Sequence, residues 1–487
     1  MKFCSYAQLL LAFLVLSSLC GSCKKEAEPE PERSQRTNEQ LLKDSVYYYF
    51  MRYSLWSNGA TADQKAVAAY TDAYNTPSEV LEALKGETPA FAAYNGSIDR
   101  FSYLENDGNS GLQAASDAHA SRGFGLFFSI GAGNDEMAYP VVYFVEGGSP
   151  AHRAGIRRSD LVLEINAQDL GIPIRCRDGS CTILDAAKKQ NVVNALLTAL
   201  EQQQMKVRLR HADDTELSFS LNAAAYEIDP IVKERVFDYS SKRIGYLALS
   251  SFEEVKPGQQ IQQHLDRVFA KFEDRQIDAL ILDLRYNTGG YISSAQYIAN
   301  KVITPVASDA LMYKYELNAF LSQRSNWKGQ SFEDVYFQRS GNLNLKTVYF
   351  LVTDITASAS ELLINVLRPY MNVVIIAENE GTYGKPVGFF KQEIMGETAL
   401  WAASFKLINS RGESDYWDGI NADQKNIADY IFADFGDPEE SMLSAAFTHS
   451  LAGQKPSETM SIFKKPVKTR KIRIAQVNAI PQTNMFR

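Results

Sequence analysis

The sequence contains few residues of the types that bind transition metals. Its 487 residues include five histidines and five cysteines, and the histidines are scattered without the spacing of metal ligands. We therefore expect no metal site. Lysine and arginine together number 50 against 58 aspartates and glutamates, which gives a formal net charge of −8. Without a basic surplus, the chain is not expected to bind nucleic acid.

The N-terminus lacks a hydrophobic run long enough to cross a bilayer. The apolar run at residues 9–16 follows Lys2 and precedes small residues, which is typical of a secretory signal. The small residues before Cys23, and the charged and proline-rich stretch after it, resemble the lipobox and tether of bacterial lipoproteins. We expect residues 1–23 to be a signal peptide in which Cys23 accepts the lipid. Cleavage and release without a lipid is the alternative.

Cysteine is also scarce in the rest of the chain. If Cys23 is acylated, Cys176 and Cys181 remain as an even pair in an oxidising compartment. We expect a disulfide between these two residues that closes a small loop. Two free thiols on a loop are the alternative.

The length of the chain indicates two or three domains, because a single hydrophobic core stops growing at a smaller size. Residues 24–40 are rich in Glu, Pro, Lys and Gln, which predicts a flexible tether. Residues 41–107 carry apolar side chains at three- and four-residue steps, which predicts a helical domain. Residues 108–225 alternate like strands around one helical stretch at residues 183–203, which predicts a small β-domain.

The organisation changes at about residue 236. Within residues 236–450, short apolar runs are separated by longer helical segments, which predicts a mostly parallel sheet with flanking helices. The runs are residues 244–249, 279–284, 348–353 and 373–377. The basic tail, residues 451–487, has no periodic pattern and carries no structural prediction. The fold class expected for the whole chain is multidomain α/β.

Two phrases within the expected β-domain resemble a PDZ domain. One is the loop Gly123-Phe124-Gly125-Leu126 with the apolar run after it, and the other spans residues 141–166. In PDZ domains such a loop offers backbone N–H groups to the terminal carboxylate of a peptide, and the peptide adds a strand to the sheet edge. The resemblance implies that residues 123–126 bind the C-terminus of a substrate. A purely structural β-domain is the alternative.

Ser358 is the candidate nucleophile. It lies among small residues where an apolar β-run ends and a helix begins. A helix N-terminus has unpaired N–H groups and a dipole, which favour the negative charge that develops on a tetrahedral intermediate. The alternative is a helix cap, in which Ser358 and Glu361 form a capping box. This segment alone favours the cap.

Lys385 is the candidate general base. It lies in the glycine-rich turn at residues 381–388, and no histidine is near either segment, so an amine is the available partner for the serine. To act at neutral pH, the pKa of Lys385 must fall from about 10.4 to about 7, which burial can cause. A solvated lysine in a surface turn is the alternative.

A third segment supplies glycines at the end of a buried strand. Gly289 and Gly290 could present backbone N–H groups that pair with the N–H of Ala359 to form an oxyanion hole. We expect Asp283 and Arg285 to form an ion pair that braces this loop. Two glycines after a strand are equally consistent with a phosphate loop or a simple turn.

The order of these segments resembles the carboxy-terminal-processing serine peptidases of family S41 and their tricorn-core relatives. The segments are residues 283–290, 356–363 and 382–385, behind a PDZ-like domain, and residues 99–104 and 245–252 resemble further phrases of the family. The resemblance implies a ClpP- or crotonase-like core and no cofactor. It also implies that Ser358 is the nucleophile, Lys385 the general base, and Ala359 with Gly289 or Gly290 the oxyanion donors.

Two positions depart from the family pattern. Phe389 stands where the family often has a glutamine that orients the lysine, and Thr356 replaces a serine. We therefore expect Lys385 to be held mainly by packing.

Together these observations predict an ATP-independent serine endopeptidase of the cell envelope. It would cut secreted or envelope proteins near their C-termini, while its lipid anchor holds it on a membrane that faces the periplasm or the cell surface. A catalytically silent scaffold that binds C-termini is the main alternative. A Ser–Lys hydrolase acting on esters or cell-wall amides is less consistent, because the Ser-x-x-Lys spacing of those enzymes is missing.

Overall fold

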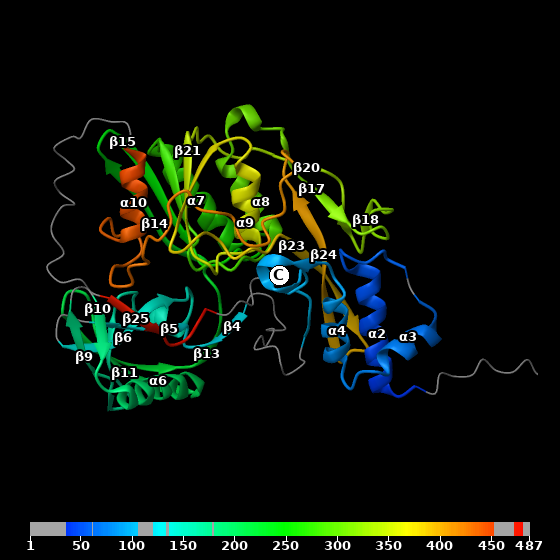
Figure 1. The fold of residues 1–487 in the computed structure, drawn as a ribbon. Helices are drawn as coiled ribbons and strands as arrows, with labels where there is room; N and C mark the ends of the chain where they lie inside the picture. Colours follow the sequence, from blue (N-terminus) through cyan, green and yellow to red (C-terminus); the bar gives the residue numbers. More distant parts are fainter. Residues whose placement is uncertain are drawn as a thin grey trace, which may run out of the picture.

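The structure, a computed structural model, describes residues 36–60, 62–105, 120–132, 136–177, 180–451 and 472–480. Figure 1 shows how these parts are arranged. The predicted signal peptide, with Cys23, and most of the predicted tether lie outside the described residues. No helix in the described part of the chain is long and apolar enough to cross a membrane.

Three helices open the described chain: α2 (Asn38–Tyr53), α3 (Gln64–Thr71) and α4 (Pro77–Gly86). The first begins three residues before the boundary expected at residue 41, because Thr37 and Gln40 form a reciprocal capping box of polar side chains. Val46 and Phe50 of α2 are buried together with Leu400 of strand β24 (Thr398–Ile408). The helices therefore dock on the rest of the chain through an apolar face. The short elements that follow are β1 (Ala90–Phe91), η1 (Ala92–Tyr94), β2 (Gly96–Ser97) and β3 (Tyr103–Leu104).

Residues 120–227, called the β-domain below, form a sheet with two helices. Its elements are β4 (Ala120–Gly123), β5 (Leu126–Ala132), β6 (Met137–Val145), α5 (Pro150–Ala154), β7 (Leu161–Ile165), β8 (Gln168–Asp169), β9 (Ile172–Arg177), β10 (Ser180–Ile183), α6 (Ala186–Glu201), β11 (Gln204–Arg210), β12 (Glu216–Asn222) and β13 (Ala224–Glu227). The main sheet runs in the order β10-β9-β6-β7-β11-β12, and β5 pairs with β6. The predicted helical stretch is α6, whose Val192 and Leu196 are buried in the core of this domain.

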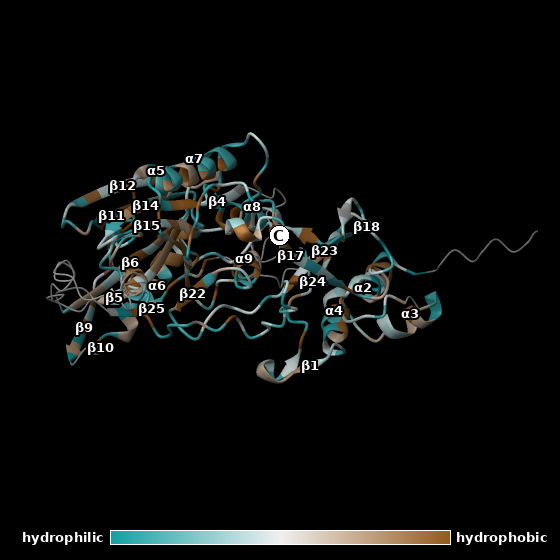
Figure 2. Ribbon diagram, turned by 90° about the horizontal axis from the view of Figure 1, so that it is seen from above, coloured by the Kyte–Doolittle hydropathy of each residue, from teal (hydrophilic) through white to brown (hydrophobic). Residues whose placement is uncertain are grey.

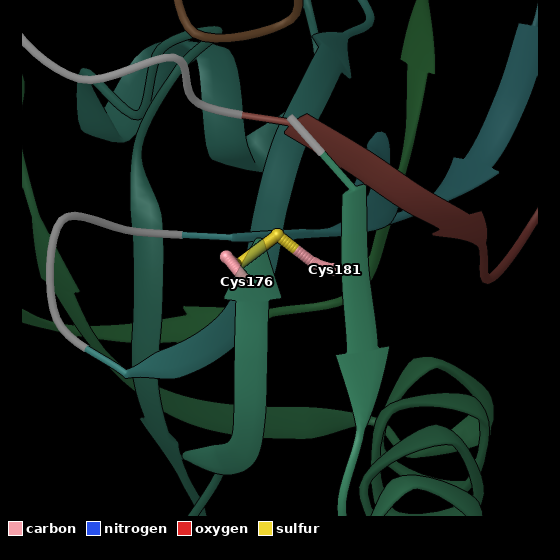
Figure 3. Close-up of a disulfide and its surroundings, with 2 residues drawn as sticks. All are labelled: Cys176 and Cys181. Atoms are coloured by element: carbon pink, nitrogen blue, oxygen red, sulfur yellow. A yellow bond between two sulfur atoms is a disulfide. The ribbon is translucent and has the colours of Figure 1, made fainter. Parts of the chain in front are cut away.

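A disulfide closes the hairpin between β9 and β10. Cys176 and Cys181 are direct cross-strand partners and are bonded to each other, as Figure 3 shows. The pair that the sequence analysis selected therefore links neighbouring strands of the β-domain, across a connection that includes residues 178–179.

The basic tail, which carried no structural prediction, contributes a strand to the β-domain. Strand β25 (Ile472–Gln476) pairs antiparallel with β5, on the side of β5 that does not face β6. In Figures 1 and 3 it is the red strand beside the blue-green strands of the β-domain.

Residues 231–451, called the α/β domain below, carry a mostly parallel five-stranded sheet. The order is β14 (Ile231–Tyr239), β15 (Lys242–Leu249), β16 (Ala279–Asp283), β21 (Thr347–Val352) and β22 (Asn372–Ala377). The four apolar runs of the sequence analysis form β15, β16, β21 and β22, which are parallel neighbours, whereas β14 is antiparallel. The helices are α7 (Gln260–Asp274), α8 (Ile292–Val302), η2 (Pro305–Ala307), α9 (Ala359–Leu367) and α10 (Ser441–Ser450). The predicted mostly parallel sheet is therefore confirmed.

A second, antiparallel sheet extends from the α/β domain toward the N-terminal helices. It runs in the order β20 (Val335–Tyr336), β17 (Leu311–Leu317), β24 and β23 (Val387–Ile394), and β3 pairs with β24. A small hairpin of β18 (Asn326–Trp327) and β19 (Gln330–Ser331) lies nearby. Figure 2 shows hydrophobic residues, in brown, along inner strands such as β6 and β15, while the loops around them are largely teal.

A buried ionic network joins the β-domain to the α/β domain. Arg158 of the β-domain and Arg285 both contact Asp429, at 2.6 and 2.8 Å. Arg285 also pairs with Asp283 at 2.8 Å and with Glu440 at 2.9 Å, so the ion pair expected between Asp283 and Arg285 is confirmed. Burial acts to raise the pKa of Asp429, but the two guanidinium groups hold that pKa below its usual value. These paired charges fix the β-domain against the strands that lead to the site.

Candidate active site

Ser358 lies between strand β21 and helix α9, in a backbone conformation that non-glycine residues seldom adopt. Its φ is 57° and its ψ is −116°. Such outliers persist where surrounding contacts impose them, often at functional sites. Ser358 immediately precedes Ala359, the first residue of α9, whose N–H has no partner within the helix. A group bound at the serine hydroxyl would therefore lie near the helix N-terminus.

The turn around Ser358 is tied to the glycine loop that follows strand β16. The hydroxyl of Thr356 accepts a hydrogen bond from the N–H of Thr353 and donates one to the carbonyl of Leu284. The hydroxyl of Ser360 donates to the carbonyl of Asn287. Thr356, which departs from the family's usual serine, therefore supplies the hydroxyl that holds the turn.

The glycine loop lies directly against the Ser358 turn. A β-carbon at Gly289 would lie 2.7 Å from the Cβ of Ser358, and one at Gly290 would lie 2.3 Å from the carbonyl oxygen of Phe252. Both glycines have a φ that side chains seldom allow, 113° and 135°. The N–H of Gly289 donates to the side-chain oxygen of Asn287 at 2.9 Å. The loop can approach Ser358 this closely only because it carries no side chains at these positions.

Lys385 is buried, with 1% of its surface exposed, and lines the same pocket as Ser358. Ala359, Leu362, Val387, Phe405, Leu407 and Tyr416 also line this pocket. Ser358 and Lys385 are 27 positions apart in the sequence, and the structure brings them to one pocket whose lining residues are mostly apolar. The solvated surface lysine, which was the alternative interpretation, is therefore wrong.

Burial lowers the pKa of Lys385 well below its usual value. The carboxyl group of Glu361 acts in the opposite direction, but its effect is smaller than that of burial. The ring of Phe389 lies with its centroid 4.3 Å from the Nζ of Lys385. An aromatic ring therefore lies beside the amine, as expected if packing orients Lys385 in place of the family's glutamine.

Glu361 joins the Ser358 turn to the turn that carries Lys385, called the lysine turn below. Its carboxyl group is fully buried and accepts four hydrogen bonds. The donors are the hydroxyl of Thr382 at 2.6 Å and the N–H groups of Gly384 at 2.7 Å, Lys385 at 2.8 Å and Ser358 at 2.9 Å. The bond to the N–H of Ser358 is one half of the predicted capping box, and the other three bonds reach the lysine turn. Glu361 thus shapes both halves of the site, while burial raises the pKa of this carboxyl group.

We expect Glu361→Gln to lower the stability of the fold by weakening the contacts between the Ser358 turn and the lysine turn. The amide oxygen can accept two of the four hydrogen bonds, but the amide N–H₂ group accepts none, so in either orientation at least one buried backbone N–H group loses its partner. The free energy of unfolding should fall by about 1–3 kcal/mol, measured by denaturant titration. The matched control is Glu380→Gln, whose side chain is exposed and pairs with Lys425. Equal stability of the Glu361 variant and the parent would contradict this role.

Two further residues, which were not predicted from the sequence to be functional, contact the site. Arg100 donates to the carbonyl oxygens of Tyr383 and Gly384, at 3.1 and 3.2 Å, and so braces the lysine turn from the N-terminal part of the chain. Tyr416 lines the pocket, and burial raises the pKa of its hydroxyl well above the usual value. Arg100 lies in a phrase that resembles the family, but nothing local in the sequence marks Tyr416.

The loop predicted to bind a carboxylate lies in the β-domain and does not line the Ser358 pocket. Phe124 is buried, and Gly125 has a φ of 71° and packs against Ser149. The carbonyl groups of Phe124 and Gly125 accept hydrogen bonds from the N–H groups of Ala151 and Glu146. The loop is therefore a tight backbone turn, separate from the candidate catalytic pocket. Within the described residues, no cluster of three or more His, Cys, Asp or Glu side chains could hold a metal ion.

Comparisons with known proteins show which proteins the chain resembles. Residues 243–425 match the model of peptidase family S41. The carboxy-terminal processing proteases CtpA and CtpB of Bacillus subtilis (strain 168) are 23% identical over 298 residues and 24% identical over 244 residues. These alignments cover 61% and 49% of this chain, and 55% and 42% of the two relatives. The chain thus spans about half the length of the curated relatives it matches.

A solved structure from Bacteroides fragilis NCTC 9343, assigned as an S41 protease, has a similar fold. The TM-score is 0.58 at 21% identity, and the match covers 84% of this chain and 96% of that one. The matched segment contains the glycine loop, the Ser358 turn and the Lys385 turn. Residues 243–425 are therefore similar in sequence to peptidase family S41.

Proposed function

We propose that the chain is a serine endopeptidase in which Ser358 is the nucleophile and Lys385 the general base. One observation carries this proposal: Lys385 is a buried lysine with a lowered pKa, and it lines the same pocket as a serine that precedes a helix N-terminus. A lysine that is neutral near physiological pH can accept a proton, whereas a charged one cannot.

The mechanism follows from the position of each group. The neutral amine of Lys385 takes the proton of the Ser358 hydroxyl as the oxygen attacks the carbonyl carbon of the scissile peptide. The tetrahedral oxyanion would be stabilised by the N–H of Ala359 together with that of Gly290. Gly289, the other glycine expected from the sequence, already donates its N–H to the side chain of Asn287. The protonated amine then gives its proton to the leaving nitrogen, and the amine activates a water that hydrolyses the acyl-enzyme. These steps use side chains and backbone alone and require no metal or cofactor.

The substrates we propose are secreted or envelope proteins, cut near their C-termini. The β-domain would bind the substrate terminus as PDZ domains do, with residues 123–126 around the carboxylate and the peptide added as a strand. Lipidation at Cys23 would anchor the enzyme to a membrane of the cell envelope. Support comes from the sequence of the loop and of the signal segment, and from relatives described as carboxy-terminal processing proteases.

The proposal predicts a preference for a free C-terminus. An unstructured peptide with a free carboxylate should be cleaved with a kcat/KM about tenfold higher than the same peptide with a C-terminal amide, because the amide loses a charge-assisted contact with the loop. Mass spectrometry of the products measures both rates and locates the cut. Equal rates for the two peptides would contradict recognition of the terminus, and an uncleaved unfolded protein would contradict the peptidase itself.

A further inference from the structure

The edge of strand β5 that faces away from β6 is covered by the chain's own C-terminal segment. Strand β25 runs antiparallel to β5, with Gln476 opposite Ser129 and Ile472 opposite Ala132. Beyond the strand, the N–H of Val477 donates to the carbonyl of Phe128 at 2.9 Å. Strand β5 follows directly after the loop of residues 123–126, so this is the edge at which a PDZ ligand would be added.

Asn478 continues the pairing with its side chain. Its Oδ1 accepts a hydrogen bond from the N–H of Phe128 at 2.7 Å, and its Nδ2 donates to the carbonyl of Leu126 at 3.0 Å. The side-chain amide thus takes the place of a further peptide group along the strand. Because the two strands are antiparallel, the segment runs toward the loop at residues 123–126. A bound substrate terminus would have this same direction.

Side chains hold the segment against both domains. Ile474, Ala475 and Val477 pack on the core of the β-domain. Ile480 is buried in a cluster that includes residues of both domains, and Arg473 lies 3.6 Å from carboxylate oxygens of Glu378 and Asp429 in the α/β domain. The segment is therefore held by side-chain contacts with both domains as well as by its pairing with β5.

We propose that residues 472–480 are an internal occupant of the substrate-binding edge, so that a substrate terminus must displace them before the β-domain can present it. The idea rests on the proposed function of the β-domain as a C-terminus binder. One strand edge can pair with one added strand at a time, so the two occupants exclude each other. Because the internal segment is tethered, its effective concentration at the edge is high. The apparent affinity for substrate equals the affinity of the open edge multiplied by the fraction of molecules in which the edge is open.

The test uses a labelled peptide with the sequence of residues 472–480, added in trans, and follows its binding by fluorescence anisotropy. The background is Ser358→Ala, so that no cleavage interferes. We expect Asn478→Ala, which removes two hydrogen bonds to β5, to tighten peptide binding about tenfold. Val477→Pro removes the N–H that bonds to Phe128 and should act in the same direction. The matched control is Ala479→Ser, an exposed position of the same segment, with unchanged binding.

Circular dichroism and thermal unfolding verify that each variant is folded, and Asn478→Ala remains as the milder change if Val477→Pro is not. With Ser358 restored, the same substitutions should lower KM for an unfolded protein by a similar factor. Unchanged binding and unchanged KM in a folded Asn478→Ala variant would overturn the internal occupant while leaving the peptidase intact. Tighter peptide binding with no proteolysis in any variant would support the occupant and reject the peptidase.

Discussion

Ser358→Ala is expected to reduce kcat on an unfolded protein substrate by about 10⁴-fold or more, because the reaction loses its nucleophile and retains only binding and the oxyanion donors. KM should change little, since the hydroxyl contributes to the transition state more than to ground-state binding. The measurement is a time course of fragment formation, with each product identified by mass spectrometry.

Ser218→Ala is the matched control for this variant. Ser218 is exposed on β12 of the β-domain and does not line the Ser358 pocket, so its replacement should leave the rate of cleavage unchanged. If Ser358→Ala cleaved as fast as the parent, a contaminating protease or another nucleophile would be responsible. In either case Ser358 would not be the catalytic serine.

Lys385→Met is expected to abolish cleavage and, at the same time, to stabilise the fold at neutral pH. Loss of the base should reduce kcat by about 10³–10⁴-fold. The stability gain follows from the lowered pKa of Lys385. Between that pKa and about 10.4, the unfolded lysine binds a proton that the folded one does not, so stability rises as the pH rises through this window. Methionine does not titrate, so it removes this destabilisation at any pH below about 10.4, and most completely at the low end of the window.

Thermal unfolding at several pH values measures the second effect. The Tm of Lys385→Met should exceed that of the parent at neutral pH, by roughly 2–4 °C for each kcal/mol gained, and the difference should shrink toward alkaline pH. Lys271→Met is the control, because Lys271 is exposed on α7 and pairs weakly with Glu234. A lower Tm for Lys385→Met at every pH would show that the amine is charged and paired in the folded protein.

The parallel strands, and the two turns that carry Ser358 and Lys385, could be predicted because their signals are local. Four short apolar runs define the parallel strands. The small residues around Ser358 and the glycines around Lys385 form patterns that can be recognised within a few neighbouring residues. Only part of the role of Glu361 could be predicted from the sequence. The capping box with Ser358 is a local pattern, whereas the three bonds to the lysine turn come from residues more than twenty positions away.

Other parts of the site depend on contacts between distant segments. Arg100 reaches the lysine turn across 284 positions of sequence, and Tyr416 reaches the pocket from a loop without periodicity. Strand β25 could not be predicted from the sequence for a similar reason. Strand β25 is short, its residues alternate only weakly, and its pairing is decided by the open edge of β5 rather than by its own composition. Edge complementarity of this kind has no local signature.

The most direct test of the account is the rate at which a fluorophosphonate modifies Ser358, located by mass spectrometry, from about pH 5 to about pH 10. We predict a single adduct on Ser358 whose rate of formation rises with pH along a curve with its midpoint below the usual lysine pKa, and no adduct in Lys385→Met. Modification of Ser358 at the same rate in the parent and in Lys385→Met would contradict the claim that the buried amine activates the serine.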